Sequence, residues 1–321
     1  ILVLHCYSRN ALAVINSLDK HYRIYGAHQG SPKSMDHFLK SPRLARIHRY
    51  PNPHRFPDHF KNKLIQLACD YNIDAIIPTG TIPTNYASEF KSSIESHSPA
   101  LVLVDEYQKL ERLTNKWQCY TLCEELDVPY PKTYLVHSTS DILHCLESKT
   151  LEFPCIMKPV IGTGAVGVYH FFNKSDMDRF CKKSETLFSQ YGSFIIQDLI
   201  QGELHDVVIC SKNGSILSEL TQERLVTWKD FGGGGIINRT TNEPTIRKYA
   251  EKIIRHLHWN GVTVWDFIKD KNDRYYLLEC NPKFWGTTQL TIEAGLNMPQ
   301  QLVDFWLLNK ELQPLTHYDV G

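Results

Sequence analysis

The chain has 321 residues, of which 42% are hydrophobic and 22% are charged, and its 35 basic and 35 acidic side chains balance to a net charge of zero. This length and composition predict a globular protein of two or three domains with a sizeable core. The balanced charge argues against nucleic acid or an anionic membrane as a partner, and no apolar run approaches the roughly 20 residues needed to span a bilayer.

The cysteines indicate a reducing environment. Nine are present without a Cys-x-x-Cys pair, and the odd number leaves at least one outside any intramolecular disulfide scheme. Most lie in apolar segments and are predicted to be small core residues. We therefore expect a cytoplasmic location. The sequence leaves the oligomeric state open and allows a homodimer.

The first part of the chain alternates strands and helices, which is typical of a parallel sheet. The segment 43–55 is rich in basic residues, histidine and proline and is predicted to be a solvated loop. The loop after the first strand lacks a Gly-x-Gly-x-x-Gly fingerprint, so no dinucleotide site is expected there. The predicted strands are 1–6, 23–27, 75–78 and 101–104, and the predicted helices are 10–18, 60–71 and 82–94.

A long helix is predicted over residues 106–126, and it ends before the Pro-Tyr-Pro sequence that closes at Pro131. Lys116 lies inside this segment, directly after Asn115. By itself it is interpreted as one more exposed helical lysine.

A glycine-rich loop follows the strand predicted at 153–158, which ends in Lys158. Gly162, Gly164 and Gly167 let backbone N–H groups approach phosphate oxygens, and Lys158 adds a positive charge beside them. A plain hairpin turn is the alternative, and Lys158 favours the phosphate-binding interpretation.

A strand at 168–172, a helix starting near Ser175 and ending at 191, and a strand at 194–200 come next. The backbone that leaves the last strand can read an adenine edge, and the Gln197 amide can add to it. Either Glu203 or His205 could hold ribose hydroxyls.

Four consecutive glycines, 232–235, are predicted to form a loop that orders over a ligand, because ordering glycines costs the most conformational entropy. Arg224 and Arg239 flank them and can neutralise a transferring phosphate or a substrate carboxylate.

Residues 262–285 predict a two-stranded hairpin, preceded by a helix at 243–258 and followed by closing helices over 291–308. Side chains alternate faces along a strand, so Asp266 stands alone among apolar neighbours, and Glu279 shares a face with Asn281. Buried carboxylates require pairing or coordination, and all-oxygen ligation favours Mg²⁺ or Mn²⁺. The hairpin alone fits equally well with two exposed acids that pair with Lys or Arg.

Taken together, these motifs resemble the ATP-grasp superfamily, and most closely the branch similar to the carbamoyl-phosphate synthase large subunit and biotin carboxylase. The resemblance implies a mixed α/β and α+β chain. A parallel-sheet pre-ATP-grasp domain would occupy 1–108, and an ATP-grasp module with nucleotide between two subdomains would occupy 109–321, with a mobile lid at about 130–198. The motifs are Asn115-Lys116, Phe153-Pro-x-x-x-Lys158-Pro, the two glycine runs, Gln197-Asp-Leu-Ile200 with Gly202-Glu203, and 278–286.

The resemblance also implies roles for individual residues. Asp266, Glu279 and Asn281 would bind magnesium or manganese, with two ions expected. Lys116 and Lys158 would contact the ATP phosphates, and the glycine loop would act as a lid over them. The ATP-binding residues implied are Lys116, Lys158, Gly162, Gly164, Gly167, Gln197, Asp198, Leu199, Ile200 and Glu203.

Arg239 and Lys283 are the predicted catalytic cations, and Arg224 and Trp285 are predicted to contact substrate. Lys283 stands where many relatives have arginine, which replaces a bidentate fork with a point charge. Val264 replaces the arginine that D-alanine–D-alanine ligases place before the metal aspartate, which argues against that specificity.

The implied function is an ATP- and Mg²⁺-dependent ligase that joins a small carboxylate to an amine through an acyl phosphate and releases ADP and phosphate. A carboxyl or carbamate kinase without ligation is one alternative. A non-catalytic nucleotide-binding regulatory protein is the other.

Overall fold

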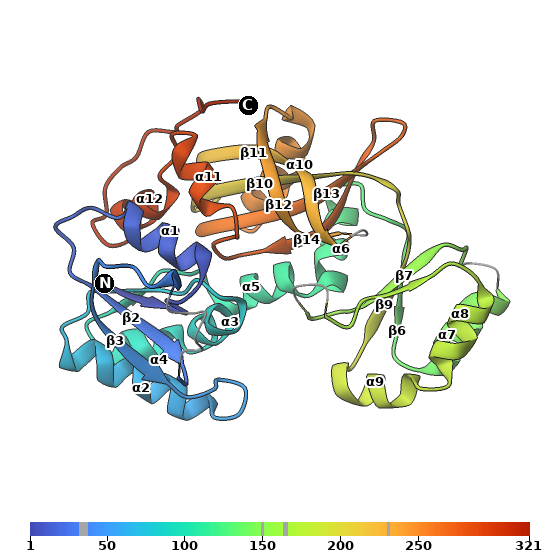
Figure 1. Ribbon diagram of the computed structural model, residues 1–321, viewed down its shortest axis with the longest axis horizontal. Coiled ribbons are helices and arrows are strands. Elements are labelled where there is room, and N and C mark those ends of the chain that lie inside the picture. Colours follow the sequence, from blue (N-terminus) through green and yellow to red (C-terminus); the bar gives the residue numbers. More distant parts are fainter. Residues whose placement is uncertain (32–37, 149–150, 163–165, 230–231) are drawn as a thin grey trace.

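Three sheets organise the chain (Figure 1). The computed structural model describes residues 1–31, 38–148, 151–162, 166–229 and 232–321, without the side chains of residues 229 and 232. A parallel five-stranded sheet comes first and is followed by a four-stranded and a five-stranded antiparallel sheet. The expected mixed α/β and α+β class is therefore confirmed.

The first sheet has the order β3-β2-β1-β4-β5 and carries helices on both faces. Apolar residues of α1 pack on one face, and those of α2 and α4 pack on the other. Its elements are β1 (Leu2–Leu4), α1 (Arg9–Ser17), β2 (Ile24–Gln29), β3 (Leu44–Tyr50), α2 (Pro57–Asp70), β4 (Ala75–Ile77), α3 (Thr81–Glu89), α4 (Lys91–His97) and β5 (Leu101–Val102).

The predicted solvated loop at 43–55 is wrong, because β3 occupies most of it. This strand pairs in parallel with β2, from Ile24 opposite Leu44 to Gln29 opposite Tyr50. Its side chains are mostly half-buried or exposed, as expected of an edge strand. Basic and histidine residues are tolerated at such an edge, and they hide its strand character in the sequence.

The second sheet lies at the right in Figure 1, in a lobe that it forms with the helices between its strands. Its order is β6-β9-β7-β8, and every pairing is antiparallel. The lobe contains β6 (Thr133–Val136), α7 (Thr139–Glu147), β7 (Cys155–Pro159), β8 (Tyr169–Phe171), α8 (Lys174–Cys181), α9 (Ser184–Tyr191) and β9 (Phe194–Asp198).

The third sheet has the order β12-β11-β10-β13-β14 and carries the predicted hairpin at its far edge. One face packs on α10, and the other packs on α12. Its elements are β10 (Gly202–Lys212), β11 (Ser215–Lys229), β12 (Gly232–Thr241), α10 (Pro244–His256), β13 (Gly261–Asp270), β14 (Tyr275–Asn281), α11 (Thr288–Glu293) and α12 (Met298–Trp306). The four glycines 232–235 begin β12, so the predicted loop there is wrong.

Three predicted helices are each two helices in the structure. The helix at 106–126 is α5 (Tyr107–Thr114) followed by α6 (Lys116–Glu125), because Asn115 accepts a hydrogen bond from the Gln118 N–H and so caps a new helix. The helix at 82–94 breaks at Phe90. The helix at 175–191 breaks between α8 and α9, and its cap is Asn173 rather than Ser175.

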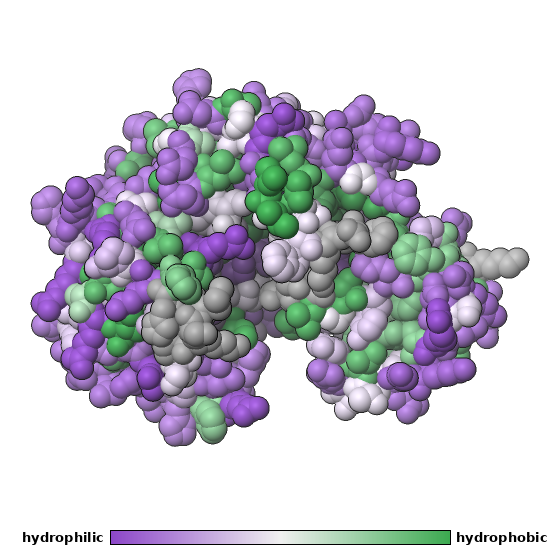
Figure 2. Space-filling model, in the orientation of Figure 1, coloured by the Kyte–Doolittle hydropathy of each residue, from purple (hydrophilic) through white to green (hydrophobic). Residues whose placement is uncertain are grey.

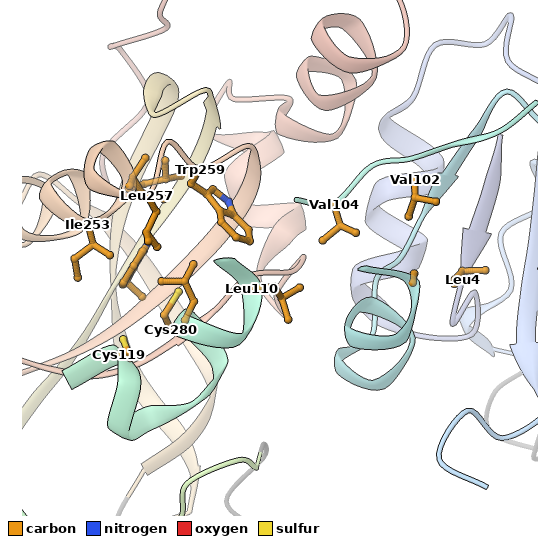
Figure 3. Close-up of a cluster of buried hydrophobic side chains, with 14 of the residues drawn as sticks. Leu4, Val102, Val104, Leu110, Cys119, Ile253, Leu257, Trp259 and Cys280 are labelled. Carbon is orange, nitrogen blue, oxygen red and sulfur yellow. The ribbon is translucent and has the colours of Figure 1, made fainter. Parts of the chain in front are cut away.

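One apolar cluster runs from the first sheet into the third (Figure 3). Val104 and Leu110 lie between the first sheet and Trp259, which is 1% exposed. The first and third sheets therefore share a continuous core, which positions the loops of one against the strands of the other. The β6–β9 lobe has its own cluster.

Among the residues that the structure describes, no helix is both long and apolar enough to cross a bilayer. All nine cysteines are free thiols, and seven of them are buried. Cys69 is exposed on α2, and Cys181 is half-buried.

Candidate functional site

The hairpin β13–β14 brings its two acids side by side. Asp266 pairs with Glu279 in the antiparallel register, and Val264 pairs with Asn281. The Asn281 Nδ2 donates a hydrogen bond to the Glu279 Oε1 at 3.1 Å. Asp266 continues the strand face on which Val264 packs with the α12 cluster. The structure thus places the three predicted metal ligands together, and their role as ligands stays a prediction.

Each acid contacts a positive side chain. The Lys116 Nζ lies 3.5 Å from the Glu279 Oε2, and the Arg224 Nη2 lies 2.6 Å from the Asp266 Oδ2. Burial raises the pKa of Asp266 to about 7, with Arg224 opposing the rise and the charges of Asp206 and Glu279 adding to it. Burial also acts to raise the pKa of Glu279, but Lys116 and Lys158 hold it below its ordinary value.

These contacts fit a hard cation. Two carboxylates and an amide supply only oxygen ligands, which is the donor set that Mg²⁺ and Mn²⁺ prefer. The described residues hold no cluster of three or more His, Cys, Asp or Glu side chains with metal-binding geometry, so no competing thiolate or imidazole site is found among them. Both half-buried acids lie against cationic groups, as expected where negative charges are partly removed from water.

Lys116 starts α6 instead of lying inside a helix. Its N–H donates to the Val160 carbonyl at 3.0 Å, and its Nζ donates to the Gly162 carbonyl at 3.0 Å. The Asn115 cap therefore directs Lys116 towards both Glu279 and the glycine loop.

Gly167 of the glycine loop has φ +72°, and a Cβ on it would lie 2.8 Å from the Pro159 Cγ. Gly164 lies outside the described residues.

We predict that Asn115→Ala lowers stability by about 1 kcal/mol through loss of the helix cap and also weakens nucleotide binding, because Lys116 moves. Thermal unfolding and ADP titration measure the two effects. Asn173→Ala removes the matched cap of α8 and is expected to lower stability alone. Equal effects of the two variants on nucleotide affinity would contradict the directing role of Asn115.

Lys158 projects from β7 into the same region. Its Nζ lies 3.2 Å from the Leu278 carbonyl and 3.4 Å from the Tyr120 hydroxyl. Burial lowers the pKa of Lys158 to about 8, and the charge of Lys116 adds to this effect. An anionic group bound beside Lys158 would therefore stabilise its charged form.

This pKa predicts a pH dependence of nucleotide binding. Lys158 is charged below pH 8 and loses its proton as the pH rises through about 8, so binding a phosphate above that point requires proton uptake. The affinity for ADP without added metal should fall by up to about tenfold per pH unit there. Lys158→Arg keeps its charge and should flatten the profile by calorimetry. A flat profile in the parent protein would contradict the prediction.

A cleft of ≈ 570 Å³ lies between the third sheet and the β6–β9 lobe. It differs from the open hollow at the bottom of Figure 2, which divides the lobe of the first sheet from the β6–β9 lobe. Leu204, Leu278 and Ile268 give the cleft apolar walls. It brings together most of the residues predicted to bind nucleotide. Those on its wall are Lys158, Gln197, Asp198, Leu199, Ile200 and Glu203.

The Gln197 amide is already engaged within the protein. Its Nε2 donates to the Thr133 hydroxyl at 2.6 Å, and its Oε1 accepts from Tyr120 at 3.5 Å. The backbone of residues 198–200 is therefore the better candidate for adenine contacts. Glu203 lines the cleft, whereas His205 is 2% exposed and packs edge-on against Tyr275. The geometry favours Glu203 for the ribose.

The remaining predicted residues differ in position. Arg224 lines the cleft, whereas Arg239 is half-exposed and pairs with Glu223 at 2.5 Å. Lys283 lines a narrow cavity of ≈ 20 Å³, and burial lowers its pKa. Trp285 is 5% exposed, stacks on Phe284 and belongs to the core. The catalytic and substrate roles of these residues stay predictions.

The narrow cavity joins the first sheet's lobe to the hairpin. One side of the cavity is formed by α3, through Thr81, Thr84 and Asn85. The other side carries the residues of the predicted site, which are Lys116, Glu279, Asn281 and Lys283. Sequence inspection missed the α3 residues, because only docking of the lobes brings them near the hairpin.

Asp206 is a further residue that was missed. It is 2% exposed on β10, pairs with Asp266 in the register and contacts Arg224. A lone acid in an apolar strand was the signal used for Asp266, and the same signal marks Asp206, which precedes the apolar residues 207–210.

Residues 113–287, more than half of the chain, match the ATP-grasp domain family. The chain belongs to the ATP-grasp family. The resemblance inferred from the motifs is thereby confirmed.

Similar proteins include ligases and carboxylases. D-aspartate ligase of Enterococcus faecium is 26% identical over 234 residues, which cover 66% of this chain and 54% of that protein. The chain thus spans about half the length of this curated relative. A biotin carboxylase–βγ-ATP complex from Campylobacter jejuni superposes with a TM-score of 0.78 at 14% identity, over 100% of this chain and 73% of that chain. An L-amino acid ligase from Bacillus licheniformis superposes with a TM-score of 0.74 at 14% identity, over 97% and 74%. At these identities the two structures show the shared fold.

Proposed function

We propose that this ATP-grasp chain is an ATP-dependent ligase that activates a small carboxylate as an acyl phosphate and transfers the acyl group to an amine, releasing ADP and phosphate. The observation that carries the proposal is the Asp266–Glu279 pair on the hairpin. Glu279 lines the narrow cavity, and Arg224, the partner of Asp266, lines the cleft. Two half-buried acids, with Lys116 and Lys158 beside them, supply the oxygen ligands and positive charges that phosphoryl transfer uses.

The chain's own side chains supply positioning and charge. The backbone of residues 198–200 would hold the adenine, and Glu203 would meet the ribose. Lys158 and Lys116 would offset negative charge on the phosphates while the substrate carboxylate attacks the γ-phosphoryl group. Asp266, Glu279 and Asn281 would hold Mg²⁺ or Mn²⁺, which when bound withdraws charge from phosphate oxygens.

The carboxylate and amine substrates have a place apart from the nucleotide in this scheme. Lys283 and the α3 residues Thr81 and Asn85 line the narrow cavity beside Glu279, on the side of the hairpin that faces the first sheet. We assign the carboxylate and amine substrates to this side. Amino acids are the first class to test, because two of the similar proteins are a D-aspartate ligase and an L-amino acid ligase.

The test is a mixture screen. Pools of amino acids and small carboxylates are incubated with the protein, ATP and Mg²⁺, and mass spectrometry detects new masses that correspond to condensation with loss of water. The proposal expects at least one amide together with equimolar ADP. ADP and an acyl phosphate without amide, in the presence of amines, would instead identify a carboxyl kinase. Tight ATP binding without turnover in every pool would identify a binding protein.

A further inference from the structure

Arg224 is shared between two acids at the wall of the cleft. Its Nε donates to the Asp206 Oδ2 at 3.1 Å, and its Nη2 contacts both the Asp206 Oδ1 and, at 2.6 Å, the Asp266 Oδ2. The side chain of Arg224 is 10% exposed, and that of Asp206 is 2% exposed. One guanidinium therefore joins the predicted metal ligand Asp266 to a second acid that the predicted site does not include.

The two acids differ in how they are held. Asp206 forms a bidentate pair with Arg224 and also accepts a hydrogen bond from the Gln222 Nε2 at 2.7 Å. Gln222 is fixed in turn by the Thr287 hydroxyl at 2.9 Å. Asp266 meets Arg224 through a single oxygen. Asp206 is thus bound into the sheet, whereas the contact of Asp266 with Arg224 is the easier one to exchange.

An arginine can exchange one partner while keeping another, because its planar fork carries five N–H donors. A cation on Asp266 would displace the Arg224 Nη2 from that acid. Without a second acid, a buried guanidinium would then lack a charge partner at a considerable cost. With Asp206 in place, the guanidinium stays at the wall of the cleft.

We propose that Asp206 is a positioning residue that retains Arg224 in the cleft when a divalent cation occupies Asp266, so that the N–H of Nη2 released from Asp266 binds the terminal phosphate of the nucleotide. This inference rests on the proposed function for the identity of the ligand. A purely structural Asp206–Arg224 ion pair would instead affect folding and leave phosphate discrimination unchanged.

A double-mutant cycle on nucleotide binding tests the inference. The variants are Asp206→Asn, Arg224→Gln and the double variant, and calorimetry gives Kd for ADP and for a non-hydrolysable ATP analogue with Mn²⁺ present. Arg224→Gln is expected to lower the preference for the analogue over ADP by about tenfold or more, the range of a hydrogen bond to a charged group. Asp206→Asn should give the same loss, and the double variant should lose nothing further.

Two results would overturn the inference. One is an unchanged preference for the analogue in Arg224→Gln, and the other is a double variant whose loss is the product of the two single losses. Asp178→Asn and Arg255→Gln, which alter exposed charges on α8 and α10, are the matched controls. If Asp206→Asn does not fold, Arg224→Lys replaces it. Lysine keeps the charge without the fork, so the preference should again fall, and a retained preference contradicts the inference.

Mn²⁺ binding without nucleotide gives a second, independent readout by electron paramagnetic resonance. Arg224→Gln removes the competitor for Asp266 and should tighten Mn²⁺ binding, while weaker binding would contradict the exchange. Neither readout needs turnover. A protein that makes no amide but passes both tests refutes the proposed ligase function alone, and a ligase that fails them refutes the role of Asp206 alone.

Discussion

Replacing Glu279 with glutamine is expected to lower the rate of ATP-dependent phosphate release by about 10²- to 10³-fold, the loss typical of removing one group that stabilises transition-state charge. Glutamine keeps the size of the side chain and the contact with Asn281, but it removes the charge that faces Lys116. The measurement is steady-state phosphate release with the substrate pair found by the screen. Mn²⁺ affinity should fall in parallel.

Glu293→Gln is the matched control, because this acid is exposed on α11 and pairs only with a neighbouring glutamine among its described contacts. It should leave both turnover and Mn²⁺ binding as in the parent. If Glu279→Gln retains parent turnover, the hairpin is not the metal site, and the acids there serve only as partners of Lys116 and Arg224.

Lys158→Met is expected to remove turnover to a similar extent, about 10²- to 10³-fold, while keeping or raising the thermal unfolding midpoint. Methionine has a comparable length and no charge. Because burial lowers the pKa of Lys158 to about 8, keeping the ammonium charged in the folded protein is costly, and methionine removes that cost.

Lys174→Met, at an exposed position of α8, is the control and should change neither property. A Lys158→Met variant that unfolds more readily yet retains turnover would show that Lys158 serves the fold and not the chemistry. Together with the profile of ADP affinity against pH, this separates the charge of Lys158 from its packing.

Local patterns predicted the parts of the site that lie on one element. Alternation along β13 and β14 was enough to place Asp266 beside Glu279, because a strand's faces follow directly from residue parity. The same reasoning placed Lys158 at the end of an apolar strand. The parallel sheet was predictable as well, because its central strands are continuously apolar.

The errors arose where tertiary contacts override local preference. The run from 106 to 126 has uninterrupted helical character, and only the Asn115 cap and the bond from the Lys116 N–H to the Val160 carbonyl show the break. β3 carries basic residues at a sheet edge, where solvent access makes a strand look like a loop. The glycines 232–235 form the first residues of β12, although their composition suggests a flexible turn.

Other residues of the site could not be read from the sequence at all. Thr81, Thr84 and Asn85 belong to the first lobe and reach the hairpin because the first and third sheets share a core. The role proposed for Arg224 depends on its contact with Asp206, 18 positions away in the sequence. This contact can be inferred only when the register of β10 and β11 is known. Pairing across strands, not local sequence, decides such contacts.

Isotope transfer tests the central claim, the acyl phosphate, most directly. The carboxylate substrate is labelled with ¹⁸O, and the phosphate released during amide formation is analysed by mass spectrometry. Attack of the carboxylate on the γ-phosphoryl group predicts that one ¹⁸O passes from the carboxylate to phosphate in each turnover. Unlabelled phosphate, with the oxygen lost from the carboxylate recovered in water instead, would contradict the mechanism proposed for this chain.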